Sequence, residues 1–126
     1  MPSLRLAPGY PAGAAIEAMA EAFTLAQKHG VPRQRLYEMV SETMFDCFVY
    51  REYVRLVASE SYKPIGARPS LIRKDYRLIL QAADAAAVPM PLANLIHDRL
   101  TAAIAKGRDD TDWAGFAREV SEAAGL

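Results

Sequence analysis

The chain has 126 residues, 52% of them hydrophobic, and its 15 basic side chains balance 15 acidic ones to a formal net charge of zero. This length suits one domain with a single core and excludes two ordinary catalytic domains. Neutrality removes the global attraction that most nucleic-acid-binding proteins use. No apolar stretch approaches the roughly 20 residues that cross a bilayer, and the first residues do not look like a secretion signal. We therefore expect a soluble, cytoplasmic protein with no membrane partner.

The first half of the chain predicts three helices. Residues 1–12 are rich in proline and glycine and are expected to form an irregular lead-in. From Gly13 onward, apolar residues recur at steps of three and four, which predicts an amphipathic helix that ends at Gly30. A short second helix is expected from about residue 33, after a proline, and a third helical run from about residue 45 to residue 58.

The second half predicts three more helices. Residues 59–70 contain two prolines and a glycine and should form an ordered connection. Residues 71–87 have the pattern of a strong helix, which two prolines separate from a further helix that ends at Gly107. The aspartates of residues 109–112 are candidate caps for a last short helix that carries Trp113. The sequence thus predicts an all-α fold of about six helices in one compact, bundle-like domain.

The single cysteine and the two histidines indicate neither a reactive-thiol site nor a metal site. Cys47 is the only cysteine, so it cannot form an internal disulfide, and its apolar surroundings predict a small core residue rather than a nucleophile. His29 and His97 are far apart in sequence and lack a second ligand at metal-binding spacing. We expect no metal, and we expect both histidines at the surface or at helix ends.

One segment matches the spacing of a DNA-binding helix-turn-helix motif, which needs a small residue, a turn glycine and two packing positions. The matching residues are Ala26, Gly30, Leu36 and Met39. The side chains that would face the DNA groove are Arg33, Gln34 and Arg35. However, the chain is neutral, and helices joined by a glycine turn are common in helical proteins. DNA binding is therefore an alternative to plain helix packing.

A second segment follows Pro69 and places charged residues near an apolar helix face. On a helical wheel, that face consists of Leu71, Leu78, Ile79, Ala82 and Ala86. Asp75 falls near the middle of the face and Lys74 at its edge. A buried carboxylate must be paired or hydrogen-bonded. Asp75 is therefore interpreted either as a partner of a nearby arginine or as the neighbour of a Lys74 that donates hydrogen bonds to a ligand.

These residues resemble the helical C-terminal domain of the NAD(P)-dependent β-hydroxyacid dehydrogenases, which include 3-hydroxyisobutyrate dehydrogenase and 2-hydroxy-3-oxopropionate reductase. The resemblance covers residues 13 to about 117, through the runs GAAIEAMAEAFTLAQKHGV, RPSLIRKDYRLILQAADAAAVPMPL and DRLTAAIAKGRDDTDWAGF. The Lys-Asp pair, the apolar pattern after it and the Val-Pro-Met-Pro-Leu break are together fairly specific. The resemblance implies a fold like the C-terminal domain of 6-phosphogluconate dehydrogenase over residues 13–126.

In that family, a Rossmann domain binds the dinucleotide through a glycine-rich loop. This sequence has no such motif, no alternation of strands and helices, and no room for the roughly 160 further residues of such a domain. The resemblance therefore implies the C-terminal part of an enzyme that uses NAD or NADP, inactive alone and without a cofactor of its own. It also implies a homodimer and no nucleic-acid partner. A stand-alone helical interaction domain is a further alternative.

The family also implies roles for individual residues. It carries a catalytic lysine followed four residues later by an asparagine, but Arg5 and Gly9 stand at these positions here. Arginine stays protonated and glycine has no side-chain amide, so no catalytic residue is expected in this chain. Lys74 matches the lysine that reaches the nicotinamide end of the cofactor, which makes it the expected cofactor-binding residue. Asp75 matches the neighbouring acid, which is expected to orient Lys74.

Overall fold

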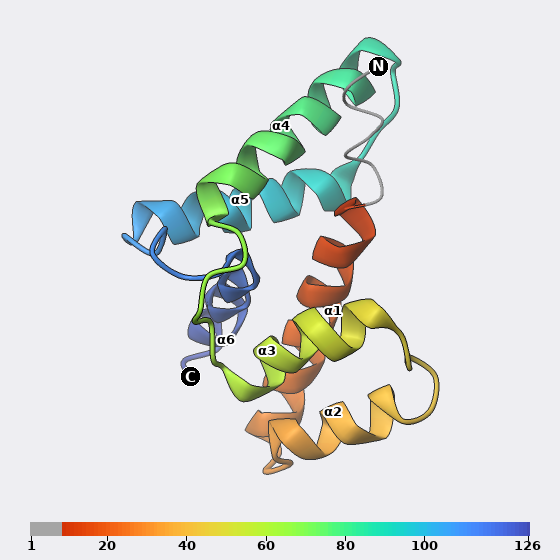
Figure 1. Ribbon diagram of the computed structural model, residues 1–126, viewed down its shortest axis with the longest axis vertical. Coiled ribbons are helices and arrows are strands. Elements are labelled where there is room, and N and C mark those ends of the chain that lie inside the picture. Colours follow the sequence, from red (N-terminus) through yellow and green to blue (C-terminus); the bar gives the residue numbers. More distant parts are fainter. Residues whose placement is uncertain (1–8) are drawn as a thin grey trace.

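The computed structural model describes residues 9–126, which form six α-helices and two short turns of other helix types (Figure 1). The order is α1 (Tyr10–Lys28), α2 (Arg33–Ser41), the π-helical turn η3 (Tyr50–Val54), α3 (Arg55–Ser59), α4 (Pro69–Ala85), α5 (Pro91–Ala105), the 3₁₀ turn η4 (Trp113–Ala117) and α6 (Arg118–Ala123). No strand is present in this part of the chain. The predicted all-α fold of about six helices is confirmed.

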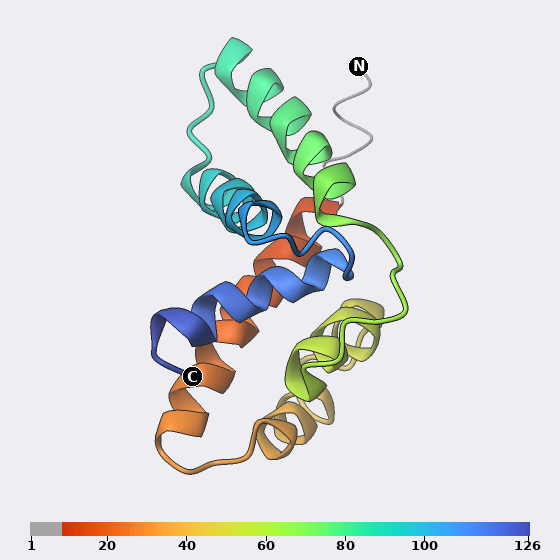
Figure 2. The same cartoon turned by 90° about the vertical axis from the view of Figure 1, so that its left-hand side faces the viewer.

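The long helix α1 holds the other elements together. The hairpin of α4 and α5 packs near its N-terminal end, while α2 and the segment of η3 and α3 pack toward its other end (Figure 1). A view turned by 90° shows α6 lying across α1 (Figure 2). Within residues 9–126, no helix is long and apolar enough to span a membrane.

The core forms where α1 meets α5 and the C-terminal elements. Its largest fully buried apolar side chains include Ile16, Phe23, Ile96, Leu100 and Phe116. Two of these come from the apolar stripe of α1, two from α5 and one from η4. The periodicity of the sequence therefore predicted the buried side of α1 correctly.

Helix ends follow the proline and glycine signals, with one difference. Helix α1 begins at Tyr10, three residues before the apolar pattern starts, because Pro11 lies in the first turn, where its missing N–H needs no partner. Gly30 and Gly107 follow α1 and α5 with φ angles of 81° and 75°, in the left-handed region that glycine tolerates. The expected ends of these two helices are confirmed.

The buried face of α4 differs from the predicted face. Tyr76, Ile79 and Ala83 are buried, while Leu71 and Leu78 are 49% and 36% exposed. The wheel grouped the leucines with Ile79, but α5 and η4 pack against the neighbouring stripe of the helix instead. The buried stripe is thus rotated about the helix axis relative to the predicted one, which leaves Leu71 and Leu78 on the outer side of α4.

The structure does not support the helix-turn-helix interpretation. Arg33 points inward: its Nη2 donates to the carbonyl of Val57 at 2.7 Å, its Nε lies 3.1 Å from Oε1 of Glu60, and its guanidinium lies 5.3 Å from the centroid of the Phe23 ring. Met39, expected to pack, is 61% exposed. The structure therefore favours the alternative of plain helix packing, because the guanidinium of Arg33 contacts Val57, Glu60 and Phe23 rather than facing outward.

Cys47 also departs from its prediction. It is exposed, because the chain leaves helical structure between α2 and η3 and carries Cys47 outward in a bend. The histidines follow the prediction: His29 is an exposed residue at the end of α1, and the side chain of His97 keeps 23% of its surface accessible on α5. Among the described residues, no group of three or more His, Cys, Asp or Glu could hold a metal ion.

Candidate functional site

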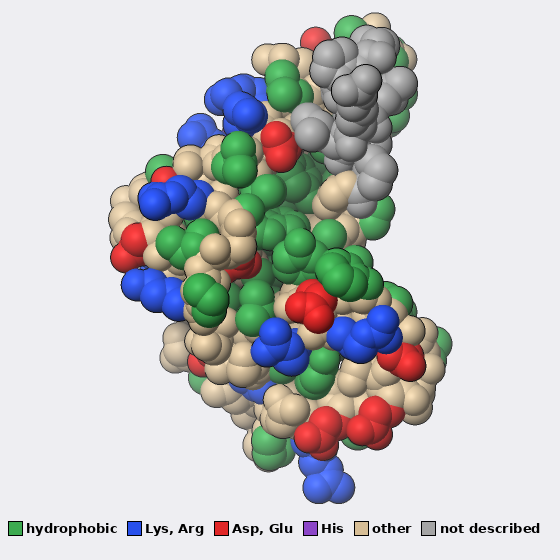
Figure 3. All heavy atoms as spheres, viewed as in Figure 1, with side chains coloured by type: hydrophobic (Ala, Val, Ile, Leu, Met, Phe, Trp, Pro, Cys, Tyr) green, Lys and Arg blue, Asp and Glu red, His purple; other side chains and the backbone are tan. Residues whose placement is uncertain are grey.

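A small cavity lies between the N-terminal end of α1, η3, the start of α4 and the beginning of η4. Its volume is about 180 Å³. The space-filling view shows hydrophobic side chains gathered in the hollow between α4 and the segment of η3 and α3 (Figure 3). We call this space the aromatic cavity, and the described residues that line it are Gly9, Tyr10, Ala12, Tyr53, Ala67, Ile72, Asp75, Tyr76, Ile79 and Trp113.

A close contact between α1 and α4 forms one wall of the aromatic cavity. The hydroxyl of Tyr76 donates to the backbone carbonyl of Tyr10 at 3.1 Å, and the two rings meet edge to face. This approach requires a residue without a side chain at Gly13, where a Cβ would lie 1.9 Å from the Tyr76 hydroxyl. Burial raises the pKa of the Tyr76 hydroxyl well above its ordinary value, so the group stays neutral.

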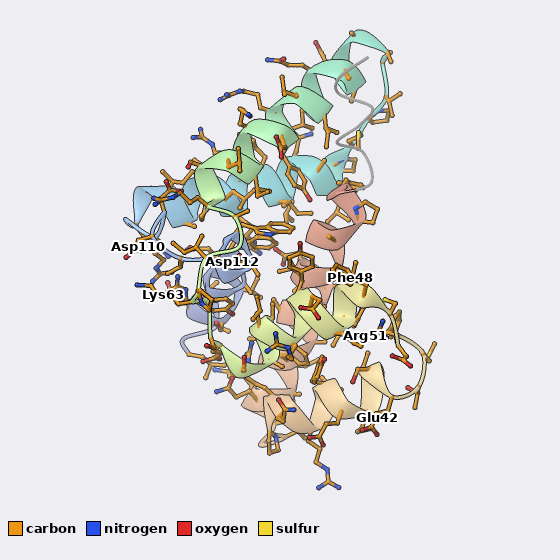
Figure 4. The ribbon with its side chains drawn as sticks, in the orientation of Figure 1. Glu42, Phe48, Arg51, Lys63, Asp110 and Asp112 are labelled. Carbon is orange, nitrogen blue, oxygen red and sulfur yellow. The ribbon has the colours of Figure 1, made fainter. Side chains whose placement is uncertain are left out.

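The opposite wall is fixed by Asp112, which lies beside the loop that leads into α4 (Figure 4). Its Oδ1 accepts hydrogen bonds from the backbone N–H groups of Gly66 at 2.9 Å and Ala67 at 3.2 Å, and its Oδ2 accepts one from Ala114 at 3.0 Å. The predicted cap is thus confirmed at Asp112. Because the same carboxylate binds the loop, it also sets the position of Trp113 against Ala67, whose carbonyl accepts from the Trp113 N–H at 2.8 Å.

A row of aromatic rings leads from the surface to the aromatic cavity. Phe48 is 63% exposed and lies just before η3 (Figure 4). Its ring meets Tyr53 edge to face at 6.4 Å between centroids, and Tyr53 meets Trp113 in the same way at 5.5 Å. The sequence alone does not mark Tyr10 and Tyr53 as site residues, because only the folded chain brings them beside α4. Their one signal in the sequence is aromatic character, at Tyr10 just before a predicted helix and at Tyr53 inside a predicted helical run.

The two charged residues of the predicted site, Lys74 and Asp75, lie in different surroundings. Asp75 is half-buried and lines the aromatic cavity, whereas Lys74 is exposed and does not line it. The ion pairs found within residues 9–126 involve other side chains, so the expected pairing of Asp75 with a nearby arginine is not formed there. Gly9 lines the aromatic cavity, and Arg5 lies outside the described residues.

Lys74 shares the outer side of α4 with the two exposed leucines, Leu71 and Leu78. These residues are spaced by three and four positions, which places them in one row on a helix. A lysine between two exposed leucines presents a charged donor within an apolar surface. Such a row can contact a protein surface and donate hydrogen bonds to a ligand held by it.

Comparison with known proteins identifies the family. Residues 6–120 match the family model described as "NAD-binding of NADP-dependent 3-hydroxyisobutyrate dehydrogenase". An uncharacterized oxidoreductase of Bacillus subtilis, YfjR, is 34% identical over 101 residues, which are 80% of this chain and 35% of that protein. L-threonate dehydrogenase of Escherichia coli K12 is 31% identical over 101 residues, which are 80% of this chain and 33% of that protein.

Solved structures show the same fold. The crystal structure of 3-hydroxyisobutyrate dehydrogenase from Salmonella typhimurium superposes with a TM-score of 0.80 at 24% identity, over 91% of this chain and 40% of that one. The Mycobacterium tuberculosis 3-hydroxyisobutyrate dehydrogenase, solved with L-serine, gives 0.76 at 23% identity, over 93% of this chain and 42% of that one. The protein belongs to the NAD(P)-dependent 3-hydroxyisobutyrate dehydrogenase family. It spans about a third of the length of the curated relatives it matches.

Proposed function

We propose that this chain acts as the C-terminal helical domain of an NAD(P)-dependent β-hydroxyacid oxidoreductase in the cytoplasm, and that it is inactive without a dinucleotide-binding domain. The family match and the share of the relatives' length that the chain covers support this proposal. The described residues contain no strand, so they offer no strand-turn-helix unit to hold the phosphates of a dinucleotide.

The main structural support for the proposal is the row of Leu71, Lys74 and Leu78 on the outer side of α4. Leu71 and Leu78 expose apolar surface on both sides of Lys74, which is what a face covered by another domain requires. Lys74 would then donate a hydrogen bond to the nicotinamide end of a cofactor held by that domain. The bound cofactor would accept or donate the hydride, while this chain binds and orients it. Asp75, next to Lys74 on α4, forms part of the wall behind that contact.

A chimeric enzyme tests this function. The C-terminal third of L-threonate dehydrogenase from Escherichia coli would be replaced by residues 9–126 of this chain. We expect the chimera to bind its nicotinamide cofactor and Lys74→Ala to weaken that binding about tenfold, because one charge-assisted hydrogen bond is lost. Fluorescence titration with the reduced cofactor measures the affinity.

The matched control is Lys63→Ala, which removes another exposed lysine, whose amine lies 3.8 Å from Asp110. This change should leave cofactor affinity unchanged. A folded chimera in which both lysine variants bind the cofactor like the parent would contradict the role of Lys74. Hydride transfer by residues 1–126 alone would contradict the need for a second domain.

We also propose that the chain forms a homodimer through an open groove between α1, α5 and α6, with a volume of about 640 Å³. Leu25 and Leu95 line this groove with exposed fractions of 63% and 39%. A second copy would bury this apolar surface.

We expect light scattering to give twice the chain mass and Leu25→Glu to give a monomer, since a buried carboxylate is costly. Leu71→Glu, on α4, is the control that keeps the dimer, and a wild-type monomer at all concentrations would refute the proposal.

A further inference from the structure

The exposed side of the C-terminal half of α1 changes in charge along its length. Glu21, Leu25 and Lys28 are spaced by four and three residues, which places them in one row on the helix. All three are exposed, and all three line the open groove between α1, α5 and α6. We call these three residues the α1 row. It is acidic at one end, apolar in the middle and basic at the other end, where His29 also lines the groove.

The acidic end of the α1 row carries more negative than positive charge. Glu21 follows Glu17 by about one helical turn, and it adds to the rise that burial causes in the pKa of Glu17. Within residues 9–126, the cation paired with Glu17 is Arg99, and Glu21 has no ion pair of its own. Two carboxylates thus share one guanidinium, so a further cation beside Glu21 would be stabilised.

The basic end of the α1 row has the opposite imbalance. Nζ of Lys28 donates to the backbone carbonyl of Ala124 at 3.0 Å, but in the part of the chain that the structure describes neither Lys28 nor His29 forms an ion pair. A carboxylate beside Lys28 would therefore gain a charge-assisted hydrogen bond. Between the two ends, Leu25 exposes 63% of its surface.

We infer that two copies of this chain pair through the α1 row in antiparallel orientation, with the two-fold axis at Leu25. In a two-fold contact, residues equally far from the axis meet, so Glu21 of each copy meets Lys28 of the other. These residues lie four positions before and three positions after Leu25, which is roughly 5 to 6 Å along the helix on either side. The two copies of Leu25 meet at the centre, beside Leu95 in the groove. This inference rests on the proposed homodimer and specifies the contact that forms it.

The charges of the α1 row also select the orientation of the second copy. If the two helices ran parallel, Glu21 would face Glu21 of the second copy and Lys28 would face Lys28, and like charges that face each other across an interface are destabilising. The antiparallel arrangement forms two ion pairs instead. It also brings a cation to the carboxylates of Glu17 and Glu21, which the folded chain leaves with one guanidinium between them. The row is therefore complementary to its own copy in one direction only.

Charge reversal tests the pairing, with self-association of the intact chain measured by analytical ultracentrifugation. Glu21→Lys and Lys28→Glu each create two repulsive contacts in a symmetric dimer, so each should weaken self-association at least about tenfold. An equimolar mixture of these two variants should form heterodimers as tightly as the wild type dimerises, because every contact then joins opposite charges. Glu38→Lys and Arg35→Glu make the same reversals at exposed positions of α2 and are the matched controls, which should dimerise like the wild type.

The outcomes separate this inference from the proposed homodimer. A wild-type chain that stays monomeric at all concentrations would overturn both. A dimeric wild type whose Glu21→Lys and Lys28→Glu variants dimerise equally well would overturn the pairing alone. A mixture of the two variants that associates no better than either variant by itself would also overturn it. Circular dichroism confirms that each variant is folded.

A disulfide tests the position of the axis. Leu25→Cys is made together with Cys47→Ser, which removes the only native cysteine. Oxidised glutathione should then link two copies of the chain, because a residue on the axis meets itself and a disulfide needs Cα atoms within about 7 Å of each other. Leu71→Cys with the same Cys47→Ser change places an exposed cysteine on α4 and should stay unlinked. Equal cross-linking of the two variants on a non-reducing gel, or none in Leu25→Cys, would overturn the axis at Leu25.

Discussion

Gly13→Ala should lower the free energy of unfolding by about 3 kcal/mol, as overpacking of a rigid core does. A Cβ at this position would lie 1.9 Å from the hydroxyl oxygen of Tyr76 and 3.0 Å from its Cζ. Tyr76 has little freedom to move, because it is 2% exposed and its hydroxyl donates to the carbonyl of Tyr10. Helices α1 and α4 would have to separate at the wall of the aromatic cavity. Urea unfolding of the variant measures the loss.

Two further variants show whether this contact is the cause. Gly9→Ala places a methyl group where no atom of residues 10–126 lies within 4 Å, so it should cost well under about 1 kcal/mol. Tyr76→Phe removes the clashing oxygen together with one hydrogen bond worth about 1 kcal/mol. The double variant Gly13→Ala, Tyr76→Phe should therefore be more stable than the sum of the single losses predicts. Simple additivity would mean that the 1.9 Å approach is not what makes alanine costly.

Arg99→Leu should destabilise the protein by about 3 kcal/mol at neutral pH, because it leaves a buried carboxylate without its partner. Glu17 is 1% exposed on α1, and its Oε1 accepts a hydrogen bond from Nε of Arg99 at 2.8 Å. Its second oxygen has no hydrogen-bond partner in the part of the chain that the structure describes. The side chain of Arg99 keeps 29% of its surface exposed. We therefore expect a loss of stability at the lower end of the roughly 3–5 kcal/mol that is usual when one partner of a buried ion pair is removed. Thermal unfolding measures it.

The same pair predicts a direction for the effect of pH. Burial raises the pKa of Glu17 above its ordinary 4.5, and Glu21 adds to this rise, while Arg99 opposes it. A raised folded-state pKa means that the folded protein binds the proton more tightly than the unfolded chain does. The corresponding stability is present below pH 4.5 and is lost as the pH rises through the raised pKa. Without Arg99 the pKa rises further, so the gap between variant and wild type should shrink as the pH falls toward 4.5.

Two variants serve as controls for this pair. Arg35→Leu removes an exposed arginine from α2 and should change stability little at any pH. Replacing both partners, Glu17→Leu with Arg99→Leu, should recover most of the loss, because no unpaired charge is then buried. A pH-independent loss in Arg99→Leu would show that the arginine stabilises the fold through the packing of its stem rather than through its charge.

Local signals in the sequence are sufficient to predict which segments are helical and to which family the chain belongs. Helical periodicity, the prolines before α4 and α5, and the glycines after α1 and α5 are local signals, and they gave the helices to within a few residues. Asp112 was recognisable as a cap for the same reason. The Lys-Asp pair and its apolar context pointed to the family that the comparisons show.

Which side of each helix is buried, and which distant residues meet, depends on how the helices pack against one another. Periodicity groups Leu71, Leu78 and Ile79, but the packing of α5 and η4 buries the neighbouring stripe of α4. Arg33 points inward because carbonyl and carboxylate partners come from α3 and the residue that follows it. The aromatic cavity joins residues from α1, η3, α4 and η4. A repeat along one helix specifies which side chains share a face, but burial and binding depend on surfaces that fold against it from elsewhere in the chain.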